Sequence, residues 1–415
     1  MKYRYNQDRY MKLKDKKMKI LEHKKTELEG NNNCVETDDV RFFDYEAGIF
    51  EIPSLEQEEL ITKYEFVENV GNGNSDLQFY REKIAKLISE SGEKNVIINS
   101  YVESGIRIYM NCFKNKKQIV YNNLFRQTIE INFQNGIALD VGSRKNSIEN
   151  FEGFVKRVNQ YINYKRNRKS DAQSGIYKVI FDPELTGLLV HEFVGHVFER
   201  DVWLENPILQ EFFSKGKIVT SEDITIVDNP CLKNGYGSYD YDDEGNKAKK
   251  TILIQNGCVF DYMKSKKYDY EGTGSCNGRF VNIGDEVLVR MSNTYMLPGK
   301  KKVSELFKEI DYGLYMVGNT DCNFSGVTQI SPREIYKIEN GRVCEALESV
   351  TVYIDPVVFL NNILGISEEC AFYGGGLGGC GKKNQWPLPI GSGGPFVAVD
   401  KLLCEFSKVK ENGIK

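Results

Sequence analysis

Two of the three histidines in this protein, His191 and His196, lie close together, and Glu192 directly follows the first. Imidazole nitrogens are common zinc ligands, and a glutamate beside such a site can act as a general base. In the familiar H-E-x-x-H pattern the two histidines share one face of a helix. Here the second histidine lies about 140° round a regular α-helix from the first. Both can face one ion only if the helix forms a π-bulge or unwinds locally, and Gly195 is a suitable place for this.

The histidines belong to a predicted helix that begins at Asp182, where an N-cap residue is followed by Pro183 at the first helical position. Apolar residues surround almost the whole helix, which is typical of a buried one. They are Leu188, Leu189, Val190, Phe193, Val194, Val197 and Phe198. Two interpretations remain: a metal site, or core imidazoles hydrogen-bonded to carbonyl groups. Two of three histidines bracketing a glutamate favour the metal.

The composition limits the class of protein. A chain of 415 residues implies two or three domains. A net charge of -4 and a pI near 5.8 give no reason to expect nucleic acid or an anionic membrane as a partner. Residues 1–25 are rich in lysine but lack the apolar core of a signal peptide, and no apolar run is long enough to cross a bilayer. The ten cysteines form no paired framework, which predicts reduced thiols in a cytoplasmic protein.

The pattern predicts an α+β fold in three parts. Residues 1–53 form a basic N-terminal arm and lead-in, residues 54–170 an N-terminal α/β domain, and residues 171–415 a β-rich C-terminal domain with the central metal-binding helix. In the α/β domain we expect helices at 76–91 and 147–164, and strands at 96–101, 105–113, 118–122 and 127–133. In the β-rich domain we expect hairpins at Asn256-Gly257 and Asn340-Gly341, a strand at 350–354 and a helix at 304–310.

A glycine-rich stretch near the C-terminus contains Cys380. The spacing from Gly376 to Lys382 fits G-x-x-x-x-G-K, but Lys383 stands where a phosphate-binding loop needs serine or threonine. Pro387 and the proline two positions later also oppose the helix that such a loop must open, so we reject a nucleotide site. Catalytic zinc sites typically have three protein ligands, and Cys380 is the best placed of the ten cysteines for the third.

The motifs also resemble a known family. Residues 191–201, with the sequence HEFVGHVFERD, resemble the H-E-x-V-G-H-x-x-E-x-D helix of the TldD/PmbA family of zinc metallopeptidases. Residues 380–391, CGKKNQWPLPIG, are similar to its C-G-K-x-G-Q-x-x-P-V-G signature, which contributes the third ligand. The stretches VDNP, YDDEG and RMSNTYMLPG, at 227–230, 241–245 and 290–299, recur in the family's order. The resemblance covers residues 181–399.

The resemblance implies a metallopeptidase that cuts unfolded peptides inside a chamber closed by a second family subunit. TldD-type subunits carry the metal helix and TldE/PmbA-type partners lack it, so this chain resembles the TldD type. We expect a dimer with a metal-less paralogue or with itself. The chain departs from the family at Arg200 and Asn384, where glycine is usual, and at Phe193 and Val197, which replace smaller residues. These departures concern the shape of the pocket and the choice of substrate.

The expected chemistry uses Zn²⁺ held by His191, His196 and Cys380, with one water whose pKa falls towards about 7. Glu192 would take the proton of that water and pass it to the leaving amine. The remaining candidates have subsidiary roles: Tyr295 or Arg290 for the oxyanion, Glu199 and Asp201 for hydrogen bonds to the imidazoles, and Asn293 with Thr294 and Tyr295 for the substrate strand.

Two other classes of function stay open. The zinc could stabilise a noncatalytic scaffold or partner subunit, in which case a fourth protein ligand such as Cys370 would be expected. Alternatively, the protein could be a zinc amidohydrolase of small substrates, which would have a small closed pocket. Glu192 weighs against the scaffold, since a purely structural site needs no carboxylate beside its histidines.

Overall fold

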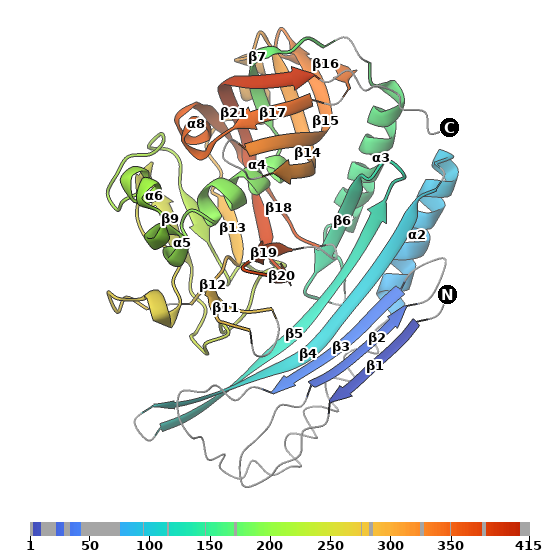
Figure 1. Cartoon of the computed structure of the whole chain (residues 1–415). Coiled ribbons are helices and arrows are strands. Elements are labelled where there is room, and N and C mark those ends of the chain that lie inside the picture. Colours follow the sequence, from blue (N-terminus) through green and yellow to red (C-terminus); the bar gives the residue numbers. More distant parts are fainter. Residues whose placement is uncertain are drawn as a thin grey trace.

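The computed structural model describes residues 3–9, 22–28, 34–42, 75–93, 95–113, 116–145, 147–169, 172–274, 276–281, 285–323, 328–348, 350–375 and 379–406. These residues form two halves that lie side by side (Figure 1). Helices and strands are mixed in the N-terminal half, and the C-terminal half is rich in strands. The predicted α+β fold is therefore confirmed. In the described part of the chain, no helix is long and apolar enough to cross a membrane.

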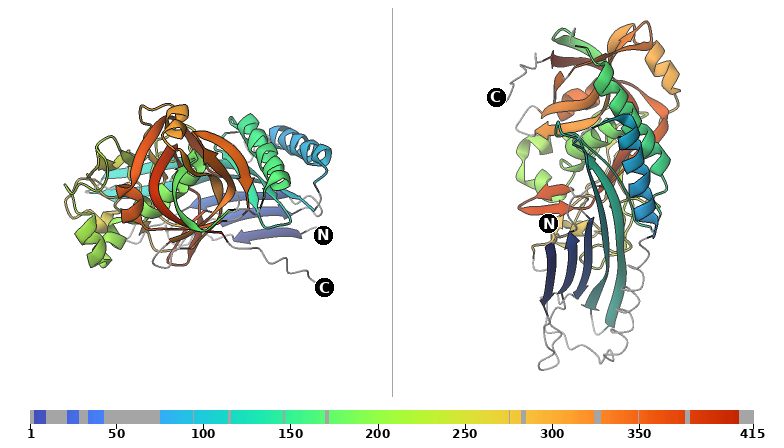
Figure 2. Two further views of the ribbon diagram at one scale, coloured as in Figure 1. Left: turned by 90° about the horizontal axis from the view of Figure 1, so that it is seen from above. Right: turned by 90° about the vertical axis from the view of Figure 1, so that its right-hand side faces the viewer.

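The N-terminal half is one sheet of six strands in the order β1-β2-β3-β4-β5-β6, with two helices on one face (Figure 2). Its elements are β1 (Tyr3–Arg9), β2 (Glu22–Leu28), β3 (Cys34–Phe42), α2 (Ser75–Ser91), β4 (Ile97–Phe113), β5 (Lys116–Asn132), β6 (Ala138–Ser143) and α3 (Phe151–Asn167). Ile84 of α2 and Phe154 of α3 are buried against Ile129 and Ile131 of β5, where alternate side chains face the helices.

Two expectations for this half are corrected. The four short strands predicted between 96 and 133 are two long ones, because β4 and β5 pair antiparallel along their whole length. The segment expected to be a basic arm contributes β1, β2 and β3, and β3 pairs parallel with β4. Both differences have one cause: backbone pairing does not require apolar alternation in the side chains, so polar stretches need not end a strand.

The C-terminal half is built around a large mixed sheet in the order β10-β9-β8-β13-β21-β17-β15-β14-β7, in which β21 also pairs with β7 and closes a ring. Its strands are β7 (Gly175–Phe181), β8 (Ile226–Asp228), β9 (Thr251–Gln255), β10 (Cys258–Val259), β13 (Asn293–Met296), β14 (Tyr312–Asn323), β15 (Thr328–Glu339), β16 (Arg342–Leu347), β17 (Val350–Ile354), β18 (Ile363–Tyr373) and β21 (Gly391–Phe406). Shorter elements are α5 (Arg200–Glu205), α6 (Pro207–Phe212), α7 (Val303–Lys308), α8 (Pro356–Asn361), β11 (Gly278–Arg279), β12 (Leu288–Val289), β19 (Cys380–Lys382) and β20 (Gln385–Leu388).

Both predicted hairpin turns are present. Asn256 and Gly257 join β9 to β10 with φ values of 49° and 77°, and Asn340 and Gly341 join β15 to β16 with 48° and 72°. Positive φ at both central residues defines the type I′ turn, which asparagine and glycine tolerate best. The predicted strand at 350–354 is β17, and the predicted helix at 304–310 appears as the shorter α7.

The helix that leads to the histidines is α4 (Pro183–Val190), and it follows β7 directly. The predicted cap is present, because Asp182 Oδ1 accepts a hydrogen bond from Leu185 N at 2.9 Å. The same oxygen accepts from Gly318 N of β14, also at 2.9 Å, so the cap ties the helix to the sheet. On its buried face Gly187 packs against the backbone of Gly393 in β21. The position of the helix therefore depends on a close approach of two backbones.

A pair of glycine variants tests this packing. In Gly187→Ala the new Cβ would lie 2.6 Å from Gly393 N, so we expect a loss of about 1–3 kcal/mol in the free energy of unfolding despite the higher helix propensity of alanine. The control is Gly153→Ala in α3, where the neighbour is the exposed side chain of Asn150, which can rotate away. This variant should be neutral or slightly stabilised. Equal effects in urea denaturation would contradict the packing argument.

Candidate active site

A π-helical turn, His191–Gly195, follows α4 and brings the two histidines together. His196 N donates to His191 O at 3.1 Å, a hydrogen bond across five residues in place of four. The extra residue in the turn moves His196 round the axis, and the centres of the two rings lie 5.0 Å apart. Gly195 leaves room here for the buried Met291, since a Cβ would lie 2.0 Å from Met291 Sδ unless that side chain moved. The departure from a regular α-helix expected from the sequence is confirmed.

Cys380 completes a cluster with the two histidines. It lies on β19, which pairs with β20 in a short hairpin, and Cys380 Sγ is 3.4 Å from His196 Nε2. His191, His196 and Cys380 each offer one ligand atom, and these three atoms lie within 4.8 Å of one another. This arrangement can hold a metal ion. Two imidazoles and one thiolate are a donor set that zinc accepts. Cys370 is not part of the group; its Sγ lies 4.0 Å from Met296 O.

Electrostatics favour the ionised form of the cysteine. Burial raises the pKa of Cys380, but the hydrogen bonds and charges of His191 and His196 outweigh it and lower the pKa to about 4. A thiolate is the form that binds metals, so Cys380 is already in the protonation state that a metal site needs.

Glu192 lies between the imidazoles, with one carboxylate oxygen 3.9 Å from His191 Nε2 and the other 3.8 Å from His196 Nε2. On a regular helix the Glu192 side chain would point away from His191, whereas in the π-helical turn its carboxylate lies near both imidazoles. Burial raises the pKa of Glu192. A carboxylate with a raised pKa is a better proton acceptor, as a general base requires.

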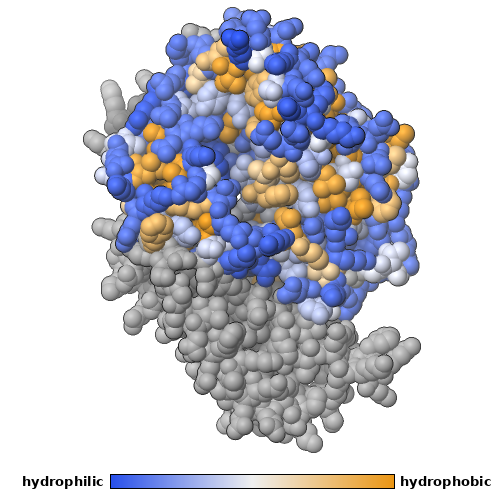
Figure 3. Space-filling view, turned by 180° about the vertical axis from the view of Figure 1, so that it is seen from behind, coloured by the Kyte–Doolittle hydropathy of each residue, from blue (hydrophilic) through white to orange (hydrophobic). Residues whose placement is uncertain are grey.

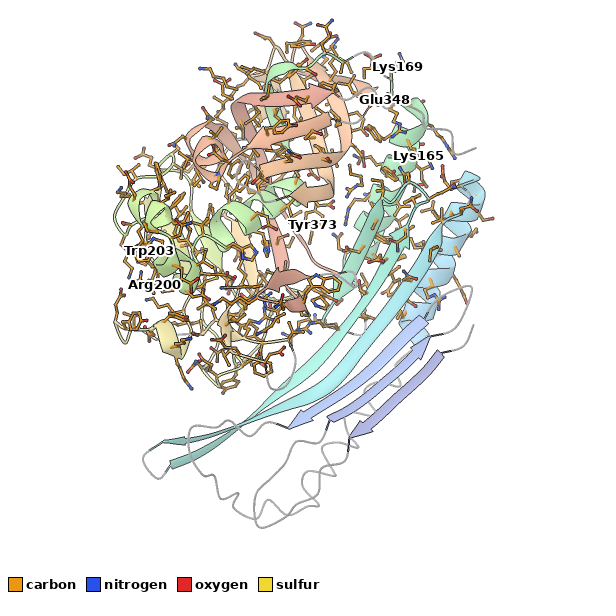
Figure 4. All side chains as sticks on the ribbon, viewed as in Figure 1. Lys165, Lys169, Arg200, Trp203, Glu348 and Tyr373 are labelled. Carbon is orange, nitrogen blue, oxygen red and sulfur yellow. The ribbon has the colours of Figure 1, made fainter. Side chains whose placement is uncertain are left out.

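The cluster faces a cavity of about 820 Å³ between the two halves. The C-terminal half contributes the histidines, Glu192 and the loop around Cys380. The N-terminal half contributes Glu130, Asp140 and Arg157. Tyr373 lies between the halves, with its ring 5.0 Å from the Arg157 guanidinium carbon (Figure 4). Both halves therefore supply polar groups to one cavity.

The sequence also matches known proteins. Residues 174–404, more than half of the chain, match the PmbA/TldA metallopeptidase C-terminal domain. The chain belongs to the TldD/PmbA metallopeptidase family. A metalloprotease of Methanothermobacter thermautotrophicus is 34% identical over 239 residues, which cover 56% of this chain and 51% of that protein. A zinc metalloprotease TldD homolog of Saccharolobus solfataricus is 34% identical over 242 residues, which cover 56% and 52%.

The chain spans about half the length of these two relatives. Among solved structures, TldE from Thermococcus kodakarensis superimposes with a TM-score of 0.57 at 18% identity, over 78% of this chain and 73% of that chain. A likeness at this identity shows a shared fold.

The subsidiary residues expected from the TldD/PmbA signature have mixed outcomes. Glu199 Oε2 accepts from His196 Nδ1 at 3.2 Å, as expected for a residue that orients the imidazole. Burial raises the pKa of Glu199, but His196 and Lys382 outweigh it and lower the pKa to about 2. Asp201 contacts no imidazole; its Oδ1 accepts from Lys382 Nζ at 2.7 Å and from Val202 N.

Arg290, Asn293 and Tyr295 do not line the cavity. Arg290 is fully buried, and its Nη2 donates to the backbone oxygen of Cys380 at 2.7 Å. The Asn293 side chain donates to Ser238 Oγ at 2.8 Å, and Tyr295 OH bonds Asn229 Nδ2 at 3.1 Å. These residues hold the surrounding loops in place and are poorly placed to contact an oxyanion or a substrate strand.

The positions at which the chain departs from the family signature also lie outside the cavity lining. Arg200 stacks between aromatic rings, with its guanidinium carbon 4.5 Å from the Trp203 ring centre and 4.7 Å from that of Tyr262 (Figure 4). Phe193 and Val197 are buried in the core. Asn384 has a φ of 65° in the turn between β19 and β20, a conformation that asparagine tolerates. These four side chains therefore do not form part of the cavity wall.

The sequence did not indicate a role for several residues that line the cavity. Lys382 belongs to the C-G-K motif but received no role, although its Nζ contacts Glu199 at 2.9 Å. Asp140 and Arg157 had no signal in the sequence, because each lies in an ordinary amphipathic element and meets the site only through the docking of the two halves.

Asp140 offers a test of the cavity wall through pH. Burial raises its pKa to about 6, partly opposed by Arg157. The native state therefore binds more protons than the unfolded state between about pH 4 and 6, and stability falls as the pH rises through this range. Asp140→Asn removes the buried charge and should raise the free energy of unfolding at pH 7 by about 1–2 kcal/mol, with little gain near pH 4.

Chemical denaturation at the two pH values measures this difference. The matched control is Asp240→Asn, at an exposed carboxylate, which should leave the pH dependence of unfolding as in the wild-type protein. An Asp140→Asn variant that parallels the wild-type protein from pH 4 to 7 would contradict the assignment.

Proposed function

We propose that the protein is a zinc-dependent peptidase that hydrolyses peptide bonds in unfolded peptides or peptide precursors. The observation that carries this proposal is the convergence of His191, His196 and Cys380 beside Glu192 at the wall of a large cavity. Membership of the TldD/PmbA metallopeptidase family and a relative named zinc metalloprotease support it.

In this proposal His191, His196 and Cys380 hold the zinc ion. Zinc supplies Lewis-acid chemistry at such sites, polarising a carbonyl group and making a water more acidic. Glu199 keeps the His196 ring oriented through the Nδ1–H···Oε2 hydrogen bond, so that Nε2 points towards Cys380. Arg290 fixes the backbone of the cysteine ligand.

Glu192 acts as the general base and then the general acid. Its carboxylate lies beside both imidazoles and lines the cavity, so it can accept a proton from the attacking water. It then gives that proton to the nitrogen of the leaving amine as the peptide bond breaks. Burial raises the pKa of Glu192, which makes its carboxylate easier to protonate during the reaction.

The cavity supports peptides as substrates. A volume of about 820 Å³ accommodates a short stretch of extended chain but not a folded domain. Carboxylates, guanidinium and backbone groups from both halves surround the space and can bind the polar backbone of a peptide. A small-molecule amidohydrolase remains the second candidate, because a cavity of this size also fits drug-sized ligands.

We also propose that the chain is a TldD-type subunit that pairs with a metal-less TldE/PmbA-type paralogue or with itself. Large apolar side chains are exposed in the C-terminal half, among them Ile176, Ile208 and Ile218 at 70%, 64% and 79%. Figure 3 shows apolar patches between hydrophilic residues on the face seen from behind. Such patches are common at protein–protein contacts.

The first test is metal content. The purified protein should hold about one zinc per chain, and His196→Ala and Cys380→Ala should each lose it, because two remaining ligands bind zinc weakly. The control is Cys404→Ala, which removes a buried cysteine of β21 outside the cluster and should keep the zinc. Elemental analysis after dialysis gives the result. Full zinc occupancy in both ligand variants would disprove the assignment.

The second test separates an enzyme from a scaffold. Glu192→Gln keeps the size of the side chain but cannot accept a proton, so peptide cleavage should fall about 10²- to 10⁴-fold while zinc binding and folding survive. An exposed glutamate of α5, Glu205, serves as the control in Glu205→Gln. The substrates are unfolded peptides and small amides, each assayed with the chain alone and with a metal-less paralogue.

Equal cleavage by the wild-type protein and Glu192→Gln would remove Glu192 from the mechanism. Cleavage of amides alone would favour the amidohydrolase. No cleavage by zinc-loaded protein with its partner present would favour the scaffold.

A further inference from the structure

Lys382 is a largely buried lysine whose ammonium group is fully occupied by protein acceptors. Its side chain is 9% exposed, and Nζ donates to Glu199 Oε2 at 2.9 Å, Asp201 Oδ1 at 2.7 Å and Val289 O at 2.9 Å. An ammonium group has three N–H donors, and these three acceptors use all of them. Lys382 therefore has no donor left for a substrate, although it lies at the cavity wall.

The lysine joins the two segments that carry the clustered residues. It lies two residues after Cys380 on β19, and Glu199 lies three residues after His196. The two segments are separated by more than 180 positions in the chain, so their relative position depends on contacts of this kind. The Lys382–Glu199 and Lys382–Asp201 ion pairs link the cysteine hairpin to the histidine segment.

One oxygen of Glu199 receives both contacts. Glu199 Oε2 accepts from Lys382 Nζ and from His196 Nδ1, while Oε1 is buried with no hydrogen-bond partner. The lysine thus fixes the oxygen to which the imidazole donates. A carboxylate anchored in this way holds His196 in the tautomer that carries its proton on Nδ1 and leaves Nε2 free to act as a ligand.

We propose that Lys382 is a positioning residue that aligns the metal ligands: through Glu199 it fixes the tautomer and orientation of His196, and it ties that imidazole to the hairpin bearing Cys380. This inference rests on the proposed zinc site. It assigns Lys382 no contact with the substrate or the reacting atoms.

The main variant is Lys382→Met, which keeps much of the side-chain volume and removes the charge. Removing an outer partner of a metal ligand commonly weakens metal binding about 10- to 100-fold, so competition with a chelator of known affinity should show zinc bound that much more weakly. Glu199→Gln should have a similar effect. Because the lysine acts through Glu199, the two changes together should weaken zinc binding much less than the product of the single effects.

Lys264 provides a matched control. It is even more deeply buried, with 3% of its side chain exposed, and it donates to Thr273 Oγ1 at 2.8 Å and Asp261 Oδ1 at 3.0 Å. It contacts none of the clustered residues. Lys264→Met therefore reproduces the general cost of losing a buried ammonium group. It should retain the zinc affinity of the wild-type protein.

The tautomer of His196 gives a readout that a merely structural lysine would not change. With three histidines in the chain, their side-chain nitrogen resonances can be assigned by single substitutions. In metal-free protein, at a pH high enough to deprotonate the His196 imidazolium, the wild-type protein and Lys264→Met should show the remaining proton on Nδ1, and Lys382→Met should show a mixture of tautomers. If Lys382→Met does not fold, the double variant Lys382→Met with Asp201→Asn replaces it. In the single variant, Glu199 and Asp201 both lose their ion-pair partner, whereas in the double variant only Glu199 does. The Glu199–His196 pair is kept in both.

Wild-type zinc affinity and an unchanged His196 tautomer in a folded Lys382 variant would overturn the inference. A failure of the wild-type protein to bind zinc would instead disprove the proposed function. In that case the tautomer measurement on metal-free protein, made at a pH high enough to deprotonate the His196 imidazolium, still decides the role of Lys382.

Discussion

The placement of the whole site depends on one extra residue in the helical turn His191–Gly195. In a regular α-helix, residues five apart diverge by about 140°, so the side chains of His191 and His196 could not share a cavity. The hydrogen bond from His196 N to His191 O replaces the usual four-residue bond and turns the second imidazole back towards the first. The same distortion brings the Glu192 carboxylate within 4 Å of both rings. A π-bulge lowers the stability of a helix, but it changes the direction in which the following side chains point, and π-bulges are frequent at functional sites.

Buried polar contacts then fix the loops around this turn. Asp228 is the clearest case, since its carboxylate accepts from Ser292 N and Oγ, Thr294 Oγ1 and Asn277 Nδ2 at 2.7–2.9 Å. These contacts join two stretches of the family signature, at 227–230 and 290–299, and the sequence had associated the second of them with substrate or oxyanion. A carboxylate with this many donors is satisfied inside the protein. The residues of these two stretches therefore shape the loops around the cavity, and none of them lines it.

The features predicted correctly from the sequence are those determined by residues close together in the chain. The Asp182 cap, the two type I′ turns and the need for a distorted turn before His196 all follow from residue types within a few positions of one another. The sequence did not foretell the lengths of β4 and β5, because pairing between backbones carried both strands through polar stretches. The role of Lys382 was also missed, since a buried lysine looks like a surface one until its acceptors are known.

The docking of the two halves adds a constraint that no local pattern contains. Glu184, in the first turn of α4, bonds Arg333 with both oxygens at 2.7 and 2.8 Å and Arg157 of α3 at 3.1 Å. Burial alone would raise the pKa of Glu184, but the two guanidinium groups lower it to about 2, so the ion pairs persist at neutral pH. The helix is thus held at its start by Asp182 and Glu184, and the segment after it is held by Glu199 and Lys382. With both ends fixed, His191, Glu192 and His196 are oriented by the fold before any ligand arrives, and a ligand need not supply the energy of arranging them.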